Sequence, residues 1–435
     1  MGKGQDLYKE AKKYIPGGTQ LLSKRPEMFL PEQWPSYYDS VKGCKVVDLD
    51  GNEYIDASFM GIGACILGYG DEDVDVAVLT AVKKGNMSTL NAPEEVELAK
   101  LLVEMHPWAD MVRYARTGGE SMAQAVRIAR AYSKKDIVLF CGYHGWHDWY
   151  LSANLSDDSA LDGHLIGGLS PTGVPRQLTG LSHPFPFNDS EEFTRLINDF
   201  KDRIGCVVLE PIRNIEPEKG FLELIQKECK DQDIPLIVDE ITSGFRLNWG
   251  GAHLLYNLEP DIAVFAKSIS NGYPMAAILG KEKIMQSAQD SFISSTYWTD
   301  RIGPSAALAT LKKMKKIDVQ SFINKQGKKI QDFWIKTADE MKLDIHVGSI
   351  FPLSHFDLTY DPLVLKTLFT QLMLGKGFLA GTSIYVCAAH TDEILDQYFG
   401  AVKDVFSSIS QAVKDGSYKE MLNGPVCHTG FKRLN

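Results

Sequence analysis

The sequence predicts an α/β protein with a mostly parallel sheet covered by helices and a smaller lobe built from both ends of the chain. Between about residues 75 and 320, segments with helical periodicity alternate with short runs that are apolar throughout. Such runs are typical of strands buried on both faces, and helices between them favour parallel pairing. The chain of 435 residues is long enough to bury a large core and a second, smaller one.

The individual elements are predicted in chain order. Residues 5–15 have the pattern of a short amphipathic helix that ends at IPGG, because proline and glycine break helices. Residues 43–58 alternate apolar and polar side chains around an Asp-Gly pair, which predicts a hairpin. The runs that predict strands of the large sheet are DIVLFC, IGCVVLE, IPLIVDE, DIAVFA and MAAILG, and the helical patterns include EEVELAKLLVEMH and MAQAVRIARAYS.

We expect three segments along the chain. They are an N-terminal arm with a small-sheet segment (1–70), a large ligand-binding domain (71–320) and a C-terminal α+β lobe (321–435). In the last segment, residues 344–358 have the pattern of strands and residues 392–416 that of a long amphipathic helix. Residues 150–188 are rich in glycine and proline and have little periodicity, which predicts a long irregular loop of the kind that covers active sites.

Composition excludes several classes of function. The chain has 46 Lys and Arg against 56 Asp and Glu, a net charge of -10, and no basic block, which argues against a nucleic-acid partner. No apolar run approaches the roughly 20 residues of a membrane span, and the N-terminus lacks the apolar core of a secretion signal. The seven cysteines are scattered without a CxxC pair, so we expect a reducing, cytoplasmic setting.

Three of the predicted strands end in ionisable residues, which are Glu210, Asp239 and Lys267. Ligands of open α/β sheets bind beyond the carboxyl ends of the strands, so these side chains are expected to face one crevice. A partly desolvated lysine loses its proton easily and forms Schiff bases with carbonyls. A buried aspartate keeps a pyridinium nitrogen protonated. Any one of the three alone is explained as well by a solvated strand end.

A turn that contains Thr117, Gly118 and Gly119 opens a predicted helix. Free backbone N–H groups and the positive end of the helix dipole favour an anion there, so the turn resembles a phosphate seat. With Glu120 in the first turn, the same residues also fit an ordinary N-cap. A P-loop is excluded, because no Lys-Ser/Thr pair follows the glycines.

The stretch GYHGWH follows another predicted strand. Tyr143 offers a flat face for stacking on a heteroaromatic ring, with His144 beside it. His144 and His147 have a spacing that two metal ligands could use, but Gly145 lies between them and no third ligand is apparent. Packed aromatic and histidine side chains therefore explain the stretch better than a metal site does.

In this order, the motifs resemble those of the class III aminotransferases, a fold type I family that depends on pyridoxal 5'-phosphate (PLP) and includes glutamate-1-semialdehyde aminomutase. The motifs are the phosphate turn, GYHGWH, LEPI, VDEITSGFR and FAKSISNGYPMAAILG. The resemblance covers nearly the whole chain and implies a seven-stranded sheet in the large domain.

The resemblance also implies a role for each candidate residue. Lys267 would form a Schiff base with PLP, Asp239 would pair with the pyridinium nitrogen, and Glu210 would lie near the lysine side of the ring. The other implied cofactor contacts are Thr117, Gly118 and Gly119 at the phosphate, Tyr143 and Ile241 on opposite faces of the ring, and His144 beside Tyr143.

A further phosphate contact in the family crosses a dimer interface, which implies a homodimer with two sites. The threonine that makes it precedes Gly-Asn-Pro in the family, and SSTYWTDRIGP stands here. Thr296 or Thr299 could make this contact with the phosphate. Thr296 is favoured because an aromatic residue follows it, as in the family. The phosphate turn also departs from the usual Ser-Gly-Thr-Glu-Ala, since Thr-Gly-Gly-Glu-Ser loses one hydroxyl donor but keeps the backbone amides.

The substrate is expected to meet the N-terminal arm. Related enzymes carry a carboxylate-binding basic residue where Lys24 and Arg25 stand, and a guanidinium makes the better bidentate clamp. Ser23, Trp34 and Tyr38 would line the same substrate entrance. A basic pair that is simply solvated on a surface arm explains Lys24 and Arg25 equally well. This arm and STYWTDRIGP resemble a branch that aminates sugar-derived carbonyls. That likeness implies amino transfer from glutamate to a keto or aldehydo sugar acid, as in the formation of 8-amino-3,8-dideoxy-manno-octulosonate for lipopolysaccharide.

Three other functions are compatible with parts of the sequence to different degrees. An intramolecular aminomutase would return the amino group to the same molecule, with the 150–188 loop retaining the intermediate. A catalytically silent homologue would have no use for Lys267 and Asp239. A nicotinamide-dependent oxidoreductase needs GxGxxG, and GIGACILGYG breaks that spacing.

Overall fold

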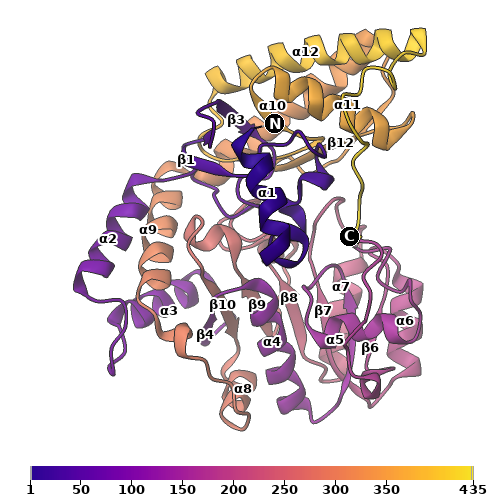
Figure 1. Ribbon diagram of the computed structural model, residues 1–435. Helices are drawn as coiled ribbons and strands as arrows, with labels where there is room; N and C mark the ends of the chain where they lie inside the picture. The colour runs from indigo at the N-terminus through magenta and orange to yellow at the C-terminus, as the bar shows by residue number, and fades with distance from the viewer. Residues whose placement is uncertain (1, 433, 435) are drawn as a thin grey trace. The chain divides into compact units, whose positions relative to one another are not determined.

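The computed structural model describes residues 2–432 and 434, and the chain forms two compact units (Figure 1). Unit 1 combines Met1–Asp71 with Ser321–Asn435, and unit 2 is Glu72–Gln320. None of the described helices has the length and apolarity that a membrane crossing requires.

Unit 2 is built around a seven-stranded sheet in the order β4-β10-β9-β8-β7-β5-β6. β10 is antiparallel to both of its neighbours, and the remaining pairs are parallel. All strands except β10 therefore point their carboxyl ends to one edge, and the prediction of a mostly parallel sheet is confirmed. The strands are β4 (Met111–Ala115), β5 (Ile137–Cys141), β6 (Ser182–Pro184), β7 (Ile204–Leu209), β8 (Leu236–Asp239), β9 (Ile262–Phe265) and β10 (Ala276–Gly280).

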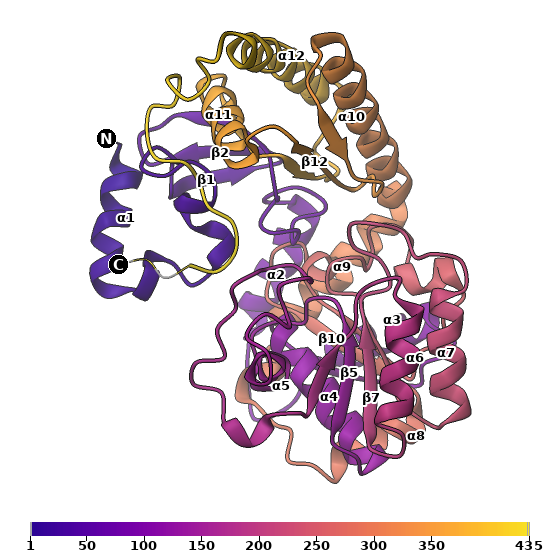
Figure 2. The same ribbon diagram turned by 90° about the vertical axis from the view of Figure 1, so that its right-hand side faces the viewer.

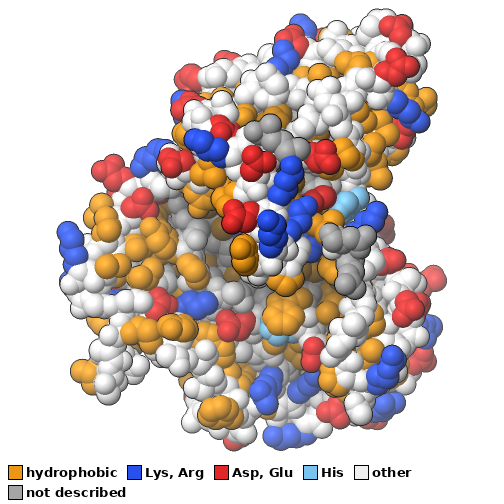
Figure 3. Space-filling view, in the orientation of Figure 1, with side chains coloured by type: hydrophobic (Ala, Val, Ile, Leu, Met, Phe, Trp, Pro, Cys, Tyr) orange, Lys and Arg blue, Asp and Glu red, His pale blue; other side chains and the backbone are white. Residues whose placement is uncertain are grey.

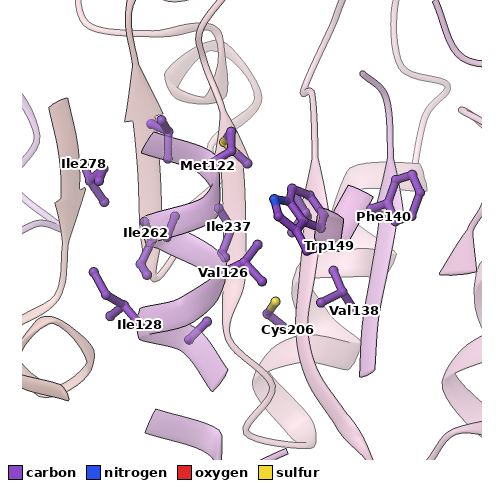
Figure 4. Close-up of a cluster of buried hydrophobic side chains, with 14 of the residues drawn as sticks. Met122, Val126, Ile128, Val138, Phe140, Trp149, Cys206, Ile237, Ile262 and Ile278 are labelled. Carbon is purple, nitrogen blue, oxygen red and sulfur yellow. The ribbon is translucent and has the colours of Figure 1, made fainter. Parts of the chain in front are cut away.

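Helices cover both faces of this sheet, as the alternation of side chains along β5 shows. Val138 and Phe140 join a buried cluster with α4 (Gly118–Ser133), drawn in Figure 4. Leu139 points the other way, into a cluster with α6 (Ser190–Asp199) and α7 (Phe221–Asp231). Figure 2 shows α4 and α7 on opposite sides of β5 and β7. The other helices of unit 2 are α2 (Glu72–Lys84), α3 (Pro93–Met105), α5 (Asp148–Leu151), α8 (Glu282–Met285) and α9 (Ile302–Ile317).

The two edge strands lie outside the five apolar runs that predicted the sheet. β4 includes the half-buried Arg113 and Tyr114, and β6 has only three residues and ends in Pro184. An edge strand has one neighbour, so it tolerates polar side chains and a residue without an N–H. Their edge positions explain why the apolar pattern misses both strands.

The predicted irregular loop is present and anchored. Between η4 (Ser152–Leu155) and β6, the only regular element among the described residues is the short 3-10 helix η5 (Arg176–Leu178). The side chain of Asn154 ties the loop together, since its Nδ2 donates to the Leu169 carbonyl at 2.6 Å and its Oδ1 accepts from the Leu161 N–H at 2.9 Å. Leu161 is fully buried.

Unit 1 joins the two ends of the chain in one sheet. The predicted hairpin is formed by β2 (Lys45–Asp48) and β3 (Glu53–Ala57). β1 (Tyr38–Lys42) pairs with β2, and β13 (Phe378–Ala380) pairs in parallel with β3. A second sheet has the order β11-β12-β14. The remaining elements include α1 (Lys3–Tyr14), α10 (Val319–Met341), which begins in unit 2, β11 (Ile345–Val347), β12 (Leu353–Leu358), α11 (Pro362–Gly375), β14 (Ser383–Tyr385) and α12 (Asp392–Asp415).

Two helical glycines of unit 1 give a matched test of its packing. A Cβ at Gly327 in α10 would lie 2.0 Å from the Phe351 carbonyl oxygen, whereas a Cβ at Gly400 in α12 meets nothing within 4 Å. We expect Gly327→Ala to lower the free energy of unfolding by about 1–3 kcal/mol through overpacking. Gly400→Ala should raise it by about 1 kcal/mol, because alanine is the better helix former. Urea unfolding measures both, and shifts of the same sign would contradict this packing.

Candidate active site

Three neighbouring parallel strands bring the predicted ionisable residues to one edge of the large sheet. Glu210 directly follows β7, Asp239 ends β8, and Lys267 lies two residues beyond β9. The sheet register pairs Asp239 with Val264, three residues before Lys267. The structure thus places the carboxylates and the amine as the strand ends predicted.

The turn after β8 has a tightly fixed backbone. The Glu240 N–H donates to the Val264 carbonyl at 2.8 Å, and the Gly244 N–H donates to the Glu240 carbonyl at 2.8 Å. A Cβ at Gly244 would lie 2.5 Å from that carbonyl oxygen, so only glycine fits. The Ser268 hydroxyl donates to the Gly244 carbonyl at 2.8 Å, which joins the turn to the residue after Lys267.

Asp239 is 2% exposed and is held at both oxygens. Its Oδ1 accepts from the Ile241 N–H at 2.9 Å, and its Oδ2 lies 2.8 Å from His144 Nδ1. The other ring nitrogen of His144, Nε2, lies 3.1 Å from the Cys141 carbonyl oxygen. His144 is therefore a buried anchor for the Asp239 carboxylate, a contact more specific than the expected place beside Tyr143.

The side chain of Lys267 is half-buried, and its Nζ donates to Thr242 Oγ1 at 2.9 Å. Burial lowers the pKa of Lys267 to about 8, an effect strengthened by the nearby Arg213 and Arg246 cations and opposed by Glu210 and Asp239. The φ angle of Lys267 is 48°, a left-handed conformation that costs a non-glycine residue about 1–3 kcal/mol. A lysine with a weakened hold on its proton is suited to attack a carbonyl.

Glu210 is engaged by an arginine of its own loop. Arg213 Nη1 lies 2.7 and 2.6 Å from the two carboxylate oxygens of Glu210, and the Tyr143 N–H donates to Oε2 at 2.9 Å. The Arg213 guanidinium lies 5.7 Å from the centroid of the Tyr143 ring. Glu210 thus fixes the loop that carries Tyr143 and holds a cation close to Lys267.

The turn before α4 has the properties of a phosphate seat. Glu120 accepts from the Arg116 and Thr117 N–H groups at 3.0 and 3.3 Å, so the N-cap reading is also correct. Among the described residues, the N–H groups of Gly118 and Gly119 have no acceptor. Free N–H groups at the start of a 16-residue helix attract an anion.

Ile241 packs against the same turn. A Cβ at Gly118 would lie 2.9 Å from Ile241 Cδ1, and one at Gly119 would lie 3.0 Å from His147 Nδ1. The glycines therefore let the β8 turn and the GYHGWH stretch approach the phosphate seat. Ile241 and Tyr143 are both partly buried at the edge of one apolar cluster, which suits the predicted sandwich around a flat ring.

The two threonines proposed for the neighbouring subunit lie in η9 (Thr296–Thr299). The Thr299 hydroxyl donates to the Thr296 carbonyl at 3.0 Å within its own turn. Thr296 is exposed, and among the described residues its hydroxyl has no partner. Arg116 pairs with Asp300 and donates to the Trp298 carbonyl at 2.9 Å, which ties this segment to the phosphate turn of the same chain.

The residues proposed for substrate lie in unit 1, and their role stays a prediction. Ser23 and Lys24 belong to η2 (Leu22–Lys24). Arg25 Nη1 donates to the Lys432 carbonyl at 2.8 Å. Trp34 is 9% exposed and stacks on Phe29 at 4.6 Å, so it belongs to the core of its unit.

Three side chains of the site were not anticipated from the sequence. They are Arg213, Thr242 and the fully buried Arg246, whose Nε donates to the Thr242 carbonyl at 2.8 Å. Arg213 left a signal, since it stands three residues after a strand-end carboxylate. Thr242 and Arg246 stand in the VDEITSGFR motif, but no periodicity predicts the direction of a side chain in this turn.

These residues fit three polar groups of PLP. The amides of Gly118 and Gly119 suit its phosphate, the buried Asp239 suits its pyridine nitrogen, and Lys267 suits its aldehyde. A mostly parallel sheet with such residues at its carboxyl edge defines a PLP-dependent enzyme of fold type I.

Comparison with known proteins gives the family. The model of the family Aminotransferase class-III matches residues 31–344, and the chain belongs to this family. It is 30% identical over 425 residues to 3-aminobutyryl-CoA aminotransferase of Cloacimonas acidaminovorans, covering 94% of this chain and 98% of the relative. It is also 30% identical over 426 residues to glutamate-1-semialdehyde 2,1-aminomutase of Methanosphaera stadtmanae, covering 93% and 98%. A solved transaminase with PLP bound superposes with a TM-score of 0.84 at 25% identity, covering 95% of this chain and 99% of that one. The protein is a PLP-dependent transaminase.

The lowered pKa of Lys267 can be measured without cofactor. Only the neutral amine reacts with acetic anhydride, so in the apoenzyme we expect acetylation of Lys267 to rise with a midpoint at about pH 8. The control is the exposed Lys227, whose hydrogen bond to Asp231 raises its pKa above the ordinary 10.5. Mass spectrometry of the two peptides across the pH range gives both curves, and coincident curves would show that the site does not weaken the ammonium.

Proposed function

We propose that this transaminase works in the cytoplasm and transfers an amino group from glutamate to the carbonyl of a sugar-derived keto or aldehydo acid. The product in view is 8-amino-3,8-dideoxy-manno-octulosonate, a component of lipopolysaccharide. The observation that carries the catalytic part is the Lys267 amine, half-buried, with a lowered pKa and near two carboxylates. Lys267 is the residue that attaches the cofactor and, when free, moves the substrate proton.

The chain's own groups each have one task in this proposal. PLP supplies an aldehyde and a ring that withdraws electrons from the substrate carbon. The Asp239 carboxylate, fixed by His144 at 2.8 Å, stabilises a proton on the ring nitrogen. The Lys267 Nζ would carry a proton between the substrate carbon and the cofactor carbon, which its lowered pKa favours. The amides of Gly118 and Gly119 hold the phosphate.

The substrate proposal rests on the polar side chains of the N-terminal arm and on the resemblance of this arm to a branch that aminates sugar-derived carbonyls. An acidic, hydroxylated substrate needs cations for its carboxylate and hydrogen-bonding groups for its hydroxyls. Lys24 and Arg25 are the cations proposed in unit 1, with Ser23 as a further contact, whereas Trp34 packs in the core of its unit and would support this segment from behind. Arg213 lies near Lys267 in unit 2 and adds a cation at the reacting end.

An intramolecular aminomutase is a second candidate. Two observations favour it: the 30% identity to an enzyme of that name, and the irregular loop between η4 and β6, anchored at Asn154. A loop that stays closed retains an intermediate in the site. The two candidates differ in one product, because only the intermolecular reaction releases 2-oxoglutarate from glutamate.

We also propose a homodimer in which Thr296 of each subunit reaches the phosphate of the other. α2 exposes Val76, Leu79 and Val82 on one side, and Figure 3 shows apolar side chains gathered over this helix. The loop after α2 carries Leu90, which is 81% exposed. An apolar surface of this kind is typical of an interface, and a second copy of the chain is the partner that the shared phosphate site requires.

This surface continues into the segment that carries Thr296. The Asn86 side chain, in the loop after α2, accepts from the Arg301 and Ile302 N–H groups at 3.1 Å. The Arg301 guanidinium pairs with Glu94 at 2.8 Å. Tyr297 beside Thr296 is 70% exposed. Burial of these apolar side chains in a dimer would therefore also fix Thr296.

Amino-group transfer is tested by product analysis. Glutamate alone should release 2-oxoglutarate and remove the near-visible absorbance of the cofactor, and an 8-oxo sugar acid should restore that absorbance.

Lys267→Ala should fold, bind PLP and lose turnover by about 10²–10⁴-fold, because the amine that carries the substrate proton is absent. Asp239→Asn should lose about tenfold or more, because a neutral amide no longer favours a charged ring nitrogen.

Full turnover by Lys267→Ala would refute the assignment of the lysine. Conversion of glutamate-1-semialdehyde without release of 2-oxoglutarate from glutamate would favour the aminomutase. Acceptance of simple alkyl aldehydes in preference to sugar acids would refute the proposed substrate class.

The shared site is tested by mixing subunits. Thr296→Ala should weaken PLP binding about tenfold, since a hydrogen bond to a charged group is lost, whereas Thr299→Ala should leave it unchanged. Coexpressed Thr296→Ala and Lys267→Ala chains should form hybrids with one intact site, so that about a quarter of all sites recover. No recovery in the mixture, with hybrids demonstrated by differential tags, would place the threonine in its own subunit's site or in neither.

A further inference from the structure

The hydroxyl of Thr242 is the hydrogen-bond partner that the structure gives to the reactive amine. Lys267 Nζ donates to Thr242 Oγ1 at 2.9 Å. Among the described residues, the ammonium has no other hydrogen-bond acceptor. Thr242 is 3% exposed. We infer that Thr242 is a positioning residue that keeps the Lys267 amine aimed in both of its protonation states; this inference rests on the proposed role of Lys267.

The carboxylates near the amine are occupied by other partners. Glu210 is paired with Arg213 and accepts from the Tyr143 N–H. Asp239 is bonded to His144 and to a backbone N–H of its own turn. A direct ion pair with either carboxylate would favour the ammonium and raise the pKa of the lysine. The site instead offers the amine a neutral partner.

A hydroxyl suits this task because it both donates and accepts. When Lys267 carries the extra proton, an N–H of the ammonium donates to Oγ1 of Thr242. When the proton has left, the threonine O–H can donate to the lone pair of the amine. A carboxylate could only accept, and a methyl group could do neither.

The position of this hydroxyl is set by the backbone of the β8 turn. The Thr242 carbonyl accepts from Arg246 Nε at 2.8 Å. The next residue, Ser243, donates its hydroxyl to the buried Glu240 carboxylate at 2.6 Å. A β-branched side chain has few rotamers, so Thr242 is held with little freedom. Valine has the same shape, which makes Thr242→Val a test of the hydroxyl alone.

Four charged groups act on the Lys267 amine and must be kept constant in that test. They are Arg213 and Glu210 beyond β7, and Arg246 and Asp239 in the β8 turn. Thr242→Val changes none of them. The variant removes the hydrogen bond from both forms of the amine, but the charge-assisted bond from the ammonium is the stronger of the two, so its loss lowers the pKa of Lys267.

The test is acetylation of Lys267 in the apoenzyme as a function of pH, followed by steady-state kinetics. We expect the midpoint of about pH 8 to fall by about one unit in Thr242→Val, which is a tenfold change in the proton equilibrium. Thr242→Ser should restore the midpoint.

In the enzyme with PLP bound, kcat should fall about tenfold in Thr242→Val, and the KM for glutamate should be nearly unchanged. The variant loses the orientation of the Lys267 amine but keeps the substrate-binding residues.

The matched control is Thr310→Val in α9. Thr310 is fully buried, and among the described residues its hydroxyl has no hydrogen-bond partner, so the same atoms change without effect on either readout. An unchanged Lys267 midpoint and kcat in Thr242→Val would overturn the inference. Turnover by Lys267→Ala would instead overturn the proposed function, whatever Thr242→Val does, so the two failures are distinguishable.

Discussion

The turn that follows β8 is the constraint on which the rest of the site depends. Asp239, the last residue of β8, and two residues of the turn each make a different contact. Asp239 is anchored by His144, Ile241 packs against Gly118, and Thr242 binds the Lys267 amine. Because the backbone of the turn is fixed by hydrogen bonds and by a glycine that no other residue could replace, these contacts keep constant spacing. The segment therefore holds at fixed spacing the residues proposed for the ring nitrogen and the ring face of PLP, together with the partner of the Lys267 amine.

The conformation and the burial of Lys267 are both unfavourable in free energy, and contacts around the residue compensate for them. Lys267 has a left-handed backbone and a desolvated amine, two features that cost free energy without helping the fold. The hydrogen bond between Ser268 and the Gly244 carbonyl of the β8 turn fixes the backbone next to the lysine. The result is an amine with a lowered pKa that is hydrogen-bonded to Thr242.

The sequence was sufficient for the five inner strands and for the positions of Asp239 and Lys267 near strand ends, because buried strands are apolar throughout and an ionisable residue after them stands out. It failed at β4 and β6, whose edge positions permit polar residues and proline. It placed His144 in the right neighbourhood but could not give its partner, because Asp239 lies on another strand 95 positions away. Thr242 and Arg246 were missed for a related reason, since the direction of a side chain in a turn is decided by tertiary contacts.

The most direct test of this account is the crystal structure of the protein with PLP bound. The account predicts a covalent bond from Lys267 Nζ to the cofactor, the Asp239 carboxylate within hydrogen-bond distance of the ring nitrogen, and the phosphate at the amides of Gly118 and Gly119. A cofactor bound elsewhere, or a ring nitrogen that faces away from Asp239, would contradict it.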